Sequence, residues 1–193
     1  GKRREVAGQT WIYPSETDCL TCHTSAAGYS LGAEVLQLNG LLTYPSTGIA
    51  ANQLVTLDHI GYLDALPAPV GSLPDMPDPA DDSAPLAERA RAYLHTNCSP
   101  CHRPGGPTPS SMDLRFETAL ADMSVCDVAA IGGDLDLGDT ARLVVPGDAT
   151  LSVLPARMNR RDAMGMPPLG SVLIDGDSVA LIDSWINSLQ GCD

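Results

Sequence analysis

The stretch Cys98-Ser99-Pro100-Cys101-His102 repeats the pattern of an earlier one, Cys19-Leu20-Thr21-Cys22-His23. In each, two residues separate a pair of cysteines, and a histidine follows the second cysteine directly. On a helical turn the two thiols stand about one turn apart and reach the same edge of a porphyrin, while the adjacent imidazole turns toward the iron. This spacing is a signature of covalent haem attachment, so the sequence predicts two haem sites.

The cysteines and the histidines of these stretches have different predicted roles. The cysteines anchor the porphyrin, and the histidines are the proximal ligands of the iron. The anchoring residues are Cys19, Cys22, Cys98 and Cys101, and the iron ligands are His23 and His102. The predicted cofactors are therefore two covalently attached haem c groups.

Zinc binding and thiol–disulfide exchange are the other chemistries that paired cysteines serve. A zinc site of this type has its two pairs about 15–20 residues apart, whereas roughly 75 residues separate the pairs here. A redox-active pair belongs beside a βαβ pattern, which the sequence does not show. The spacing therefore favours haem over both alternatives.

The sixth ligand of the second haem is predicted from the stretch Gly165-Met166-Pro167-Pro168. Two prolines fix the backbone next to a thioether, so Met166 is the leading candidate and Met164 the alternative. The other methionines of this half are more easily explained as core residues; they are Met112, Met123 and Met158. Histidine and methionine together fill the iron's axial positions, and this ligation predicts electron transfer rather than catalysis.

The sixth ligand of the first haem has several candidates. His59 leads because it lies in a predicted apolar helix, Met76 between two prolines is second, and His95 just before the second motif is third. An open sixth position is a further alternative. No Met-Pro-Pro stretch accompanies the first motif, so the pattern of the second half does not extend to it.

The charge of the chain indicates which kind of macromolecule it binds. The chain has 193 residues with a formal net charge of −13, which argues against nucleic acid and predicts a redox protein with a basic docking surface. The one basic cluster, Lys2-Arg3-Arg4, is expected to be a solvated tail, with a docking segment as the alternative.

Only 4% of the residues are aromatic, so a porphyrin would supply apolar volume that the side chains lack.

Cysteine usage predicts an exported protein. Haem is attached through thioether bonds in the bacterial periplasm or an equivalent compartment, so we expect a mature form or a fragment that has lost its leader. Cys126 and Cys192 remain outside the two motifs, and an even remainder in an oxidising compartment predicts a disulfide between them. No apolar run approaches the roughly 18 residues that a membrane-spanning helix needs.

The predicted fold is all-α, with two small haem-binding lobes at residues 1–80 and 81–193. The proline-rich stretch 67–85 divides them, since it holds neither a continuous helix nor a central strand. Helical spacing predicts helices near residues 83–97, 152–161 and 177–189, and a buried helix over 51–66. Residues 142–145 are a candidate short strand, and little room is left for a helix in front of Cys19.

The chain, from about Trp11 to Leu189, resembles the bacterial diheme c-type cytochromes that are often C-terminal modules of larger secreted proteins. The stretches that carry the resemblance are Trp11-Ile12-Tyr13-Pro14-Ser15, Cys19-Leu20-Thr21-Cys22-His23-Thr24, Gln37-Leu38-Asn39, Asn52-Gln53-Leu54, Ala90-Arg91-Ala92-Tyr93-Leu94, Asn97-Cys98, Cys101-His102-Arg103-Pro104-Gly105-Gly106 and Met166-Pro167-Pro168. The resemblance implies two mostly helical haem-binding lobes and an exported location.

The second half by itself also resembles class I cytochrome c, in which a leading helix, the haem motif, a methionine loop and a closing helix follow one another. The first half departs from this plan because it lacks the leading helix and the methionine loop. The expected function is electron transfer between exported redox partners through two haems. A diheme peroxidase with an open haem site is the alternative, and an electron-entry module of a larger assembly is a third possibility.

Overall fold

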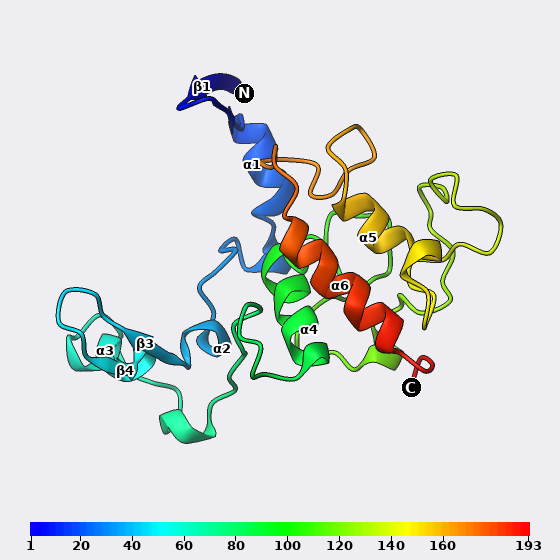
Figure 1. Cartoon of the computed structure of the whole chain (residues 1–193). Helices are drawn as coiled ribbons and strands as arrows, with labels where there is room; N and C mark the ends of the chain where they lie inside the picture. Colours follow the sequence, from blue (N-terminus) through cyan, green and yellow to red (C-terminus); the bar gives the residue numbers. More distant parts are fainter.

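The computed structural model describes residues 1–193 as a mixed α/β protein with six α-helices and two small antiparallel sheets (Figure 1). The prediction of an all-α fold is wrong, since 32% of the residues are helical and both sheets lie in the first half. The α-helices are α1 (Glu16–Cys22), α2 (Val35–Leu38), α3 (Gln53–His59), α4 (Leu86–Asn97), α5 (Val153–Met158) and α6 (Gly176–Ser188). Short 3-10 helices span Ser25–Ala27, Val70–Ser72, Leu120–Asp122 and Ala149–Leu151.

The N-terminal residues form a β-hairpin where a solvated tail was expected. Strand β1 (Lys2–Val6) pairs antiparallel with β2 (Gln9–Tyr13), so that Lys2 lies opposite Tyr13. Ala7 and Gly8 link the strands with positive φ angles of 51° and 79°, the backbone geometry of a tight hairpin turn. Because β2 holds threonine, tryptophan, isoleucine and tyrosine, its composition favours a strand.

The helix predicted over residues 51–66 is much shorter in the structure. Strand β3 (Leu41–Thr43) pairs with β4 (Ala50–Asn52), and the Asn52 side chain then caps α3 at its start. Gly61 has a φ of 71°, the left-handed conformation in which helices commonly end. Of the apolar residues in α3 only Leu54 is buried, so the expectation of a buried helix is also wrong.

The helices of the second half follow the sequence pattern more closely. Helix α4 begins after Pro85, without a side-chain cap from Ser83, and α5 covers only the first part of the predicted 152–161. Helix α6 is capped by Asp175 rather than by Asp177. Residues 142–145 form isolated bridges, not a strand.

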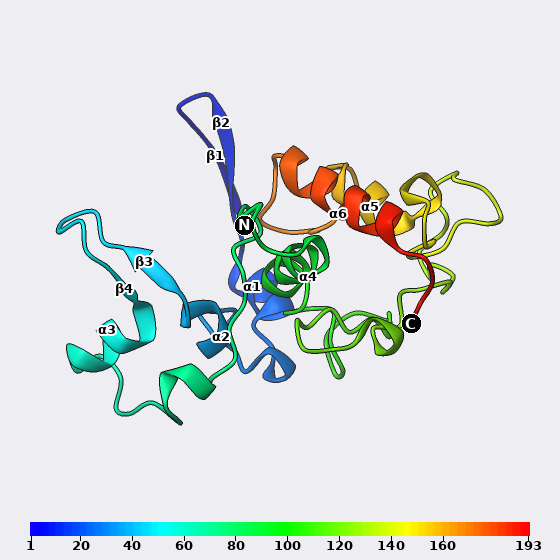
Figure 2. The same cartoon turned by 60° about the horizontal axis from the view of Figure 1, so that its bottom comes forward.

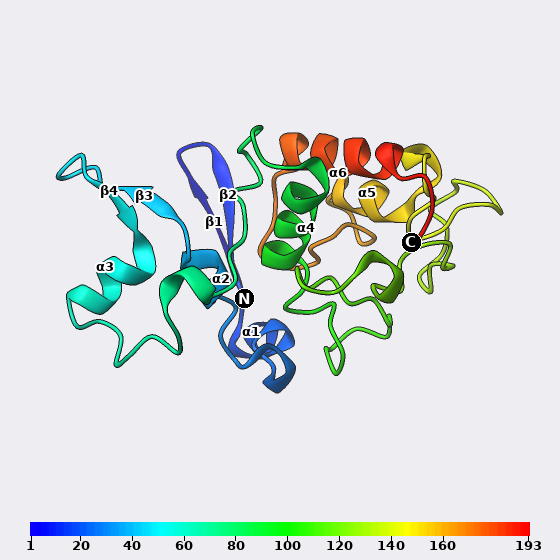
Figure 3. The same ribbon diagram turned by 90° about the horizontal axis from the view of Figure 1, so that it is seen from below.

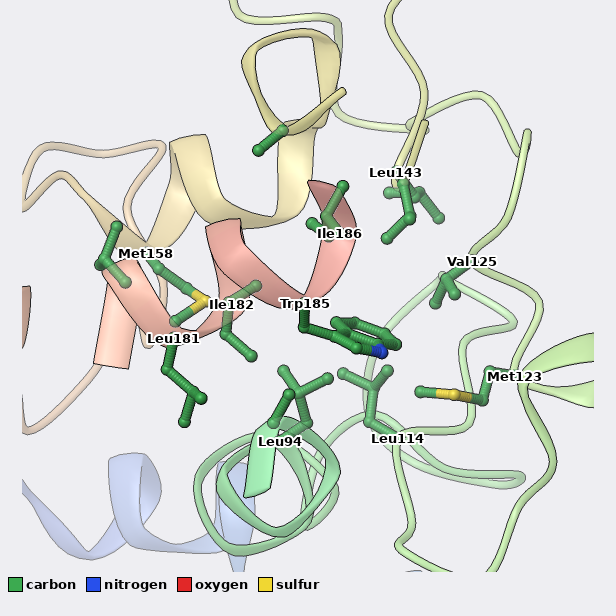
Figure 4. Close-up of a cluster of buried hydrophobic side chains, with 14 residues drawn as sticks. Leu94, Leu114, Met123, Val125, Leu143, Met158, Leu181, Ile182, Trp185 and Ile186 are labelled. Carbon is green, nitrogen blue, oxygen red and sulfur yellow. The ribbon is translucent and has the colours of Figure 1, made fainter. Parts of the chain in front are cut away.

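The hydrophobic core lies between α4, α6 and the loops of the second half. Helices α4 and α6 pack across each other in all three views (Figures 1–3). Trp185 of α6 is 1% exposed and lies among Leu94, Leu114 and Val125 at the centre of the cluster (Figure 4). A well-packed aromatic ring of this kind supports a stable scaffold for the loops that carry the second motif.

The first half has few buried apolar side chains, which are Ala27, Leu36 and Leu54. Strands β3 and β4 and helix α3 form an arm that projects away from the α4–α6 core (Figures 1–3). The Asn39 side chain donates to the carbonyls of Val70, Leu73 and Pro74, and it also accepts a bond from Asn52. Residues 70–74 of the proline-rich stretch are therefore held beside Asn39, at the start of the arm. No helix is both long and apolar enough to cross a membrane.

Cys126 and Cys192 are joined as a disulfide, with Cα atoms 5.7 Å apart. The bond ties the loop after Val125 to the segment that follows α6, across a separation of 66 residues. Closing a loop of this length restricts the unfolded chain, so we expect the double replacement Cys126→Ser with Cys192→Ser to lower the free energy of unfolding by about 3–5 kcal/mol. Denaturant unfolding of both proteins measures the difference. Labelling of two thiols outside the haem motifs in the unreduced, denatured wild type would contradict the bond.

Candidate functional site

The second motif forms the turn that ends helix α4. The backbone N–H of Cys98 donates to Leu94 O at 2.9 Å, which makes Cys98 the helix C-cap. The N–H groups of Cys101 and His102 then both donate to Cys98 O, at 3.1 Å and 2.9 Å. This tight turn places the two cysteines and the histidine at the helix end, where all three line one cleft.

A cleft of about 270 Å³ opens next to this turn. Its lining brings Cys98, Cys101 and His102 together with Met166, which is more than 60 positions away in the sequence. Apolar side chains from α5 and α6, Met158 and Val179 among them, form part of the wall. This volume is slightly below the range of about 300–1,000 Å³ that is usual for small-molecule and cofactor sites. The residues predicted for the second haem therefore share one apolar-walled cleft.

His102 is suited to bind a metal at this cleft. Its Nδ1 atom is buried and has no hydrogen-bond partner, a costly state for a polar group. Burial lowers the pKa of His102, which favours the neutral imidazole that binds metals. The backbone at this point is fixed because Leu114 N–H donates to His102 O at 2.9 Å. The donor chemistry thus fits an iron ligand.

The methionine loop is held by two arginines. Met166 N–H donates to Arg157 O at 2.9 Å, and Arg161 Nη1 donates to Met166 O at 3.2 Å and to Met158 O at 2.8 Å. Met164 does not line the cleft, and its carbonyl accepts a bond from Arg157 Nη1 at 3.0 Å. The structure therefore favours Met166 over Met164 as the sulfur that faces the second motif.

Burial raises the pKa values of both thiols in the second motif. Burial, reinforced by Cys101, raises the pKa of Cys98 to about 12, and burial with a hydrogen bond to Cys22 raises the pKa of Cys101 to about 11. Reactive and zinc-binding cysteines need the thiolate, which a lowered pKa favours. No three histidine, cysteine, aspartate or glutamate side chains gather as a metal ion would need. A haem iron needs fewer protein ligands than a bare metal ion, because the porphyrin supplies the others.

The first motif lies on helix α1 and not after a long leading helix. Ser15 caps α1 and exchanges hydrogen bonds with Asp18, which fixes the start of the helix just ahead of Cys19. His23 ends the helix, and its Nδ1 atom lies 2.7 Å from Tyr29 O. When Nδ1 carries the proton for that bond, Nε2 keeps a free lone pair for a metal. This contact is the kind that leaves Nε2 of a histidine available to a metal.

The three candidate sixth ligands of the first haem lie in different elements of the structure. His59 is exposed at the end of α3, and α3 lies apart from α1 in all three views (Figures 1–3). His95 is buried and engaged, because its Nδ1 accepts from Phe116 N–H at 3.0 Å and its Nε2 lies 3.5 Å from Glu34. Met76 follows the 3-10 helix Val70–Ser72 within the proline-rich stretch 67–85. Ligation of iron by His59 therefore stays a prediction.

The two motifs meet, which their separation in the sequence does not indicate. The sulfur atoms of Cys22 and Cys101 lie 3.6 Å apart, although 79 positions separate these residues. Cys22 also lines the cleft of the second motif. The wall residues Tyr93 and Arg161 were not predicted either, because nothing in a local pattern marks them as facing a cofactor. The two sites therefore form one continuous region of the molecule.

Comparison with known proteins adds no assignment: no family model, curated protein or solved structure matches the chain.

Proposed function

We propose that the protein is a diheme c-type cytochrome that transfers electrons between exported redox partners. The observation that carries this proposal is the shared cleft of Cys98, Cys101, His102 and Met166. Two thiols, a neutral imidazole and a thioether are the groups that anchor a haem and fill both axial positions of its iron. The contact of His23 Nδ1 with Tyr29 O, which would leave Nε2 to bind iron, supports a second site of the same kind at Cys19 and Cys22.

The residues of the chain have separate tasks in this function. A bound haem supplies an iron that gains and loses one electron. Cys98 and Cys101 would anchor it, and His102 and Met166 would hold its iron, which would leave no position for substrate. Met158 and Val179 exclude water from the cleft wall, which favours the uncharged forms of nearby groups. A net charge of −13 attracts a basic partner and speeds its approach.

A peroxidase-type enzyme is the second candidate, and it concerns the first haem. His59 is exposed at the end of α3, and both ring nitrogens of His95 already have protein partners. A haem at His23 that lacked a sixth protein ligand would bind peroxide or another small ligand. In such an enzyme the second haem feeds electrons to the open one. The two functions differ in whether an added ligand reaches the iron.

Two measurements test the proposal. Intact mass after denaturation should show two added haems in the wild type and one in a Cys19→Ala, Cys22→Ala variant or in a Cys98→Ala, Cys101→Ala variant. Visible spectra with cyanide, carbon monoxide and peroxide then report the sixth position of each haem. Unchanged spectra support electron transfer alone, whereas a spectrum altered in one haem supports the enzyme. Absence of covalent haem, or bound zinc in its place, would reject both.

A further inference from the structure

The contact between the two motifs is held by a network around Arg103. Arg103 directly follows His102, and its side chain is 14% exposed. Its Nε donates to Ser99 O at 2.7 Å and its Nη2 donates to Ser99 Oγ at 3.0 Å, both within the second motif. Ser99 is fully buried, so this end of the guanidinium is fixed.

The other end of the same guanidinium reaches the first half of the chain. Arg103 Nη1 donates to Ala26 O at 3.3 Å, three residues after His23. Glu34 lies 3.9 Å from Nη2 of Arg103 and also faces the buried His95 of α4. A buried charge needs such partners, and the planar guanidinium directs its N–H groups toward all of them at once.

We propose that Arg103 is a positioning residue that holds the two haem-attachment turns against each other, so that the two haems act as a closely coupled pair within one chain. This inference rests on the proposed function. The 3.6 Å contact between Cys22 and Cys101 is the point at which the two sites touch. The other polar contacts between these two halves join α4 to the segment around α2 and not to the turns themselves: Gln37 Nε2 lies 3.5 Å from Thr96 Oγ1, and Glu34 lies 3.5 Å from His95 Nε2.

The test uses the haem-loaded full chain and circular dichroism in the Soret band. Two haems in close, fixed contact give a split signal of opposite signs, because their transitions couple with a strength that falls with the third power of distance. We expect the split signal in the wild type and its loss in Arg103→Ala, with the two haems still present by intact mass. Arg103→Lys should also lose it, since an ammonium lacks the fork that spans the two turns.

Arg89→Ala is the matched control. Arg89 also lies on the α4 side of the molecule and is similarly shielded at 17% exposure, but it contacts Pro79 O and Asp82, away from both motifs. Its replacement should leave the split signal unchanged. A general loss of stability would weaken the signal in both arginine variants.

Each outcome separates the inference from the proposed function. Fewer than two haems in the wild type would reject the proposed function itself. Two haems without a split signal would reject the coupled pair alone, and a split signal that persists in Arg103→Ala would reject the role of Arg103. If Arg103→Ala fails to load both haems, Arg103→Lys decides. If both Arg103 variants fail to bind two haems while Arg89→Ala binds both, Arg103 is needed for haem attachment. That result would overturn its assignment as a positioning residue.

Discussion

Replacing Met166 by alanine is expected to abolish the methionine-to-iron charge-transfer band of the second haem and to open its sixth position to carbon monoxide and cyanide. Met166 is the methionine of the stiff Gly165–Pro168 loop that lines the same cleft as His102. The loop holds this sulfur in place through bonds from Met166 N–H to Arg157 O and from Arg161 to Met166 O. Because alanine has no donor atom, the iron would be left with one protein ligand.

Met166→His separates ligation from packing. Imidazole keeps the iron six-coordinate but favours the oxidised metal more than a thioether does. We expect the reduction potential of the second haem to fall by on the order of 100 mV, within the roughly 0.8 V over which axial ligands set haem potentials. Redox titration, followed in the visible spectrum, measures the shift.

Met164→Ala is the control for both Met166 variants. Met164 lies two residues before Met166 but does not line the cleft. Its replacement should therefore leave the charge-transfer band and the potential close to those of the wild type. If the band survives in Met166→Ala and disappears in Met164→Ala, the ligand is the other sulfur.

Features that depend on short-range spacing could be placed from the sequence. The turn at Cys98–His102 and the helices around it follow from helix geometry, and the prolines single out Met166, whose ligation of iron stays a prediction. Helix α6 was predicted from the apolar stripe that contains Trp185, and this stripe packs into the core (Figure 4).

The contacts between distant segments could not be predicted in the same way. The meeting of Cys22 and Cys101 depends on how α1 lies against the end of α4, and no local pattern encodes that arrangement. In the first half, helical spacing over residues 51–66 was outweighed by a hairpin and by the left-handed Gly61. Apolar residues there also lack a core to fill, so their periodicity carries less information than it does in α6.

That shortage of core has a consequence for the proposed haems. In the first half Leu20, Tyr29 and Tyr62 are exposed, whereas the second half buries a continuous cluster around Trp185. Small units that bury little apolar surface need additional stabilisation, and a bound cofactor is one source. The first haem would therefore contribute relatively more to the stability of its surroundings than the second.

Gly106→Ala is expected to disrupt the second haem site although no ligand is changed. A Cβ atom at Gly106 would lie 2.2 Å from Cys101 O and 2.9 Å from Arg103 O, both of them backbone atoms. The backbone N–H of Gly106 also donates to Arg103 O at 2.9 Å, so the turn cannot open without losing that bond. Overpacking of this kind costs about 1–3 kcal/mol, and we expect a value at the upper end because rigid backbone has to move.

Two measurements and a control substitution at another glycine test this prediction. Denaturant unfolding of Gly106→Ala should show the loss of stability, and intact mass should show incomplete attachment at Cys98 and Cys101. Gly71→Ala is the control, because a Cβ atom at Gly71 meets nothing within 4 Å and its backbone is not left-handed. Equal stability and full attachment in Gly106→Ala would mean that the turn after His102 is wider than the structure has it, and that the second motif does not depend on the close packing of this turn.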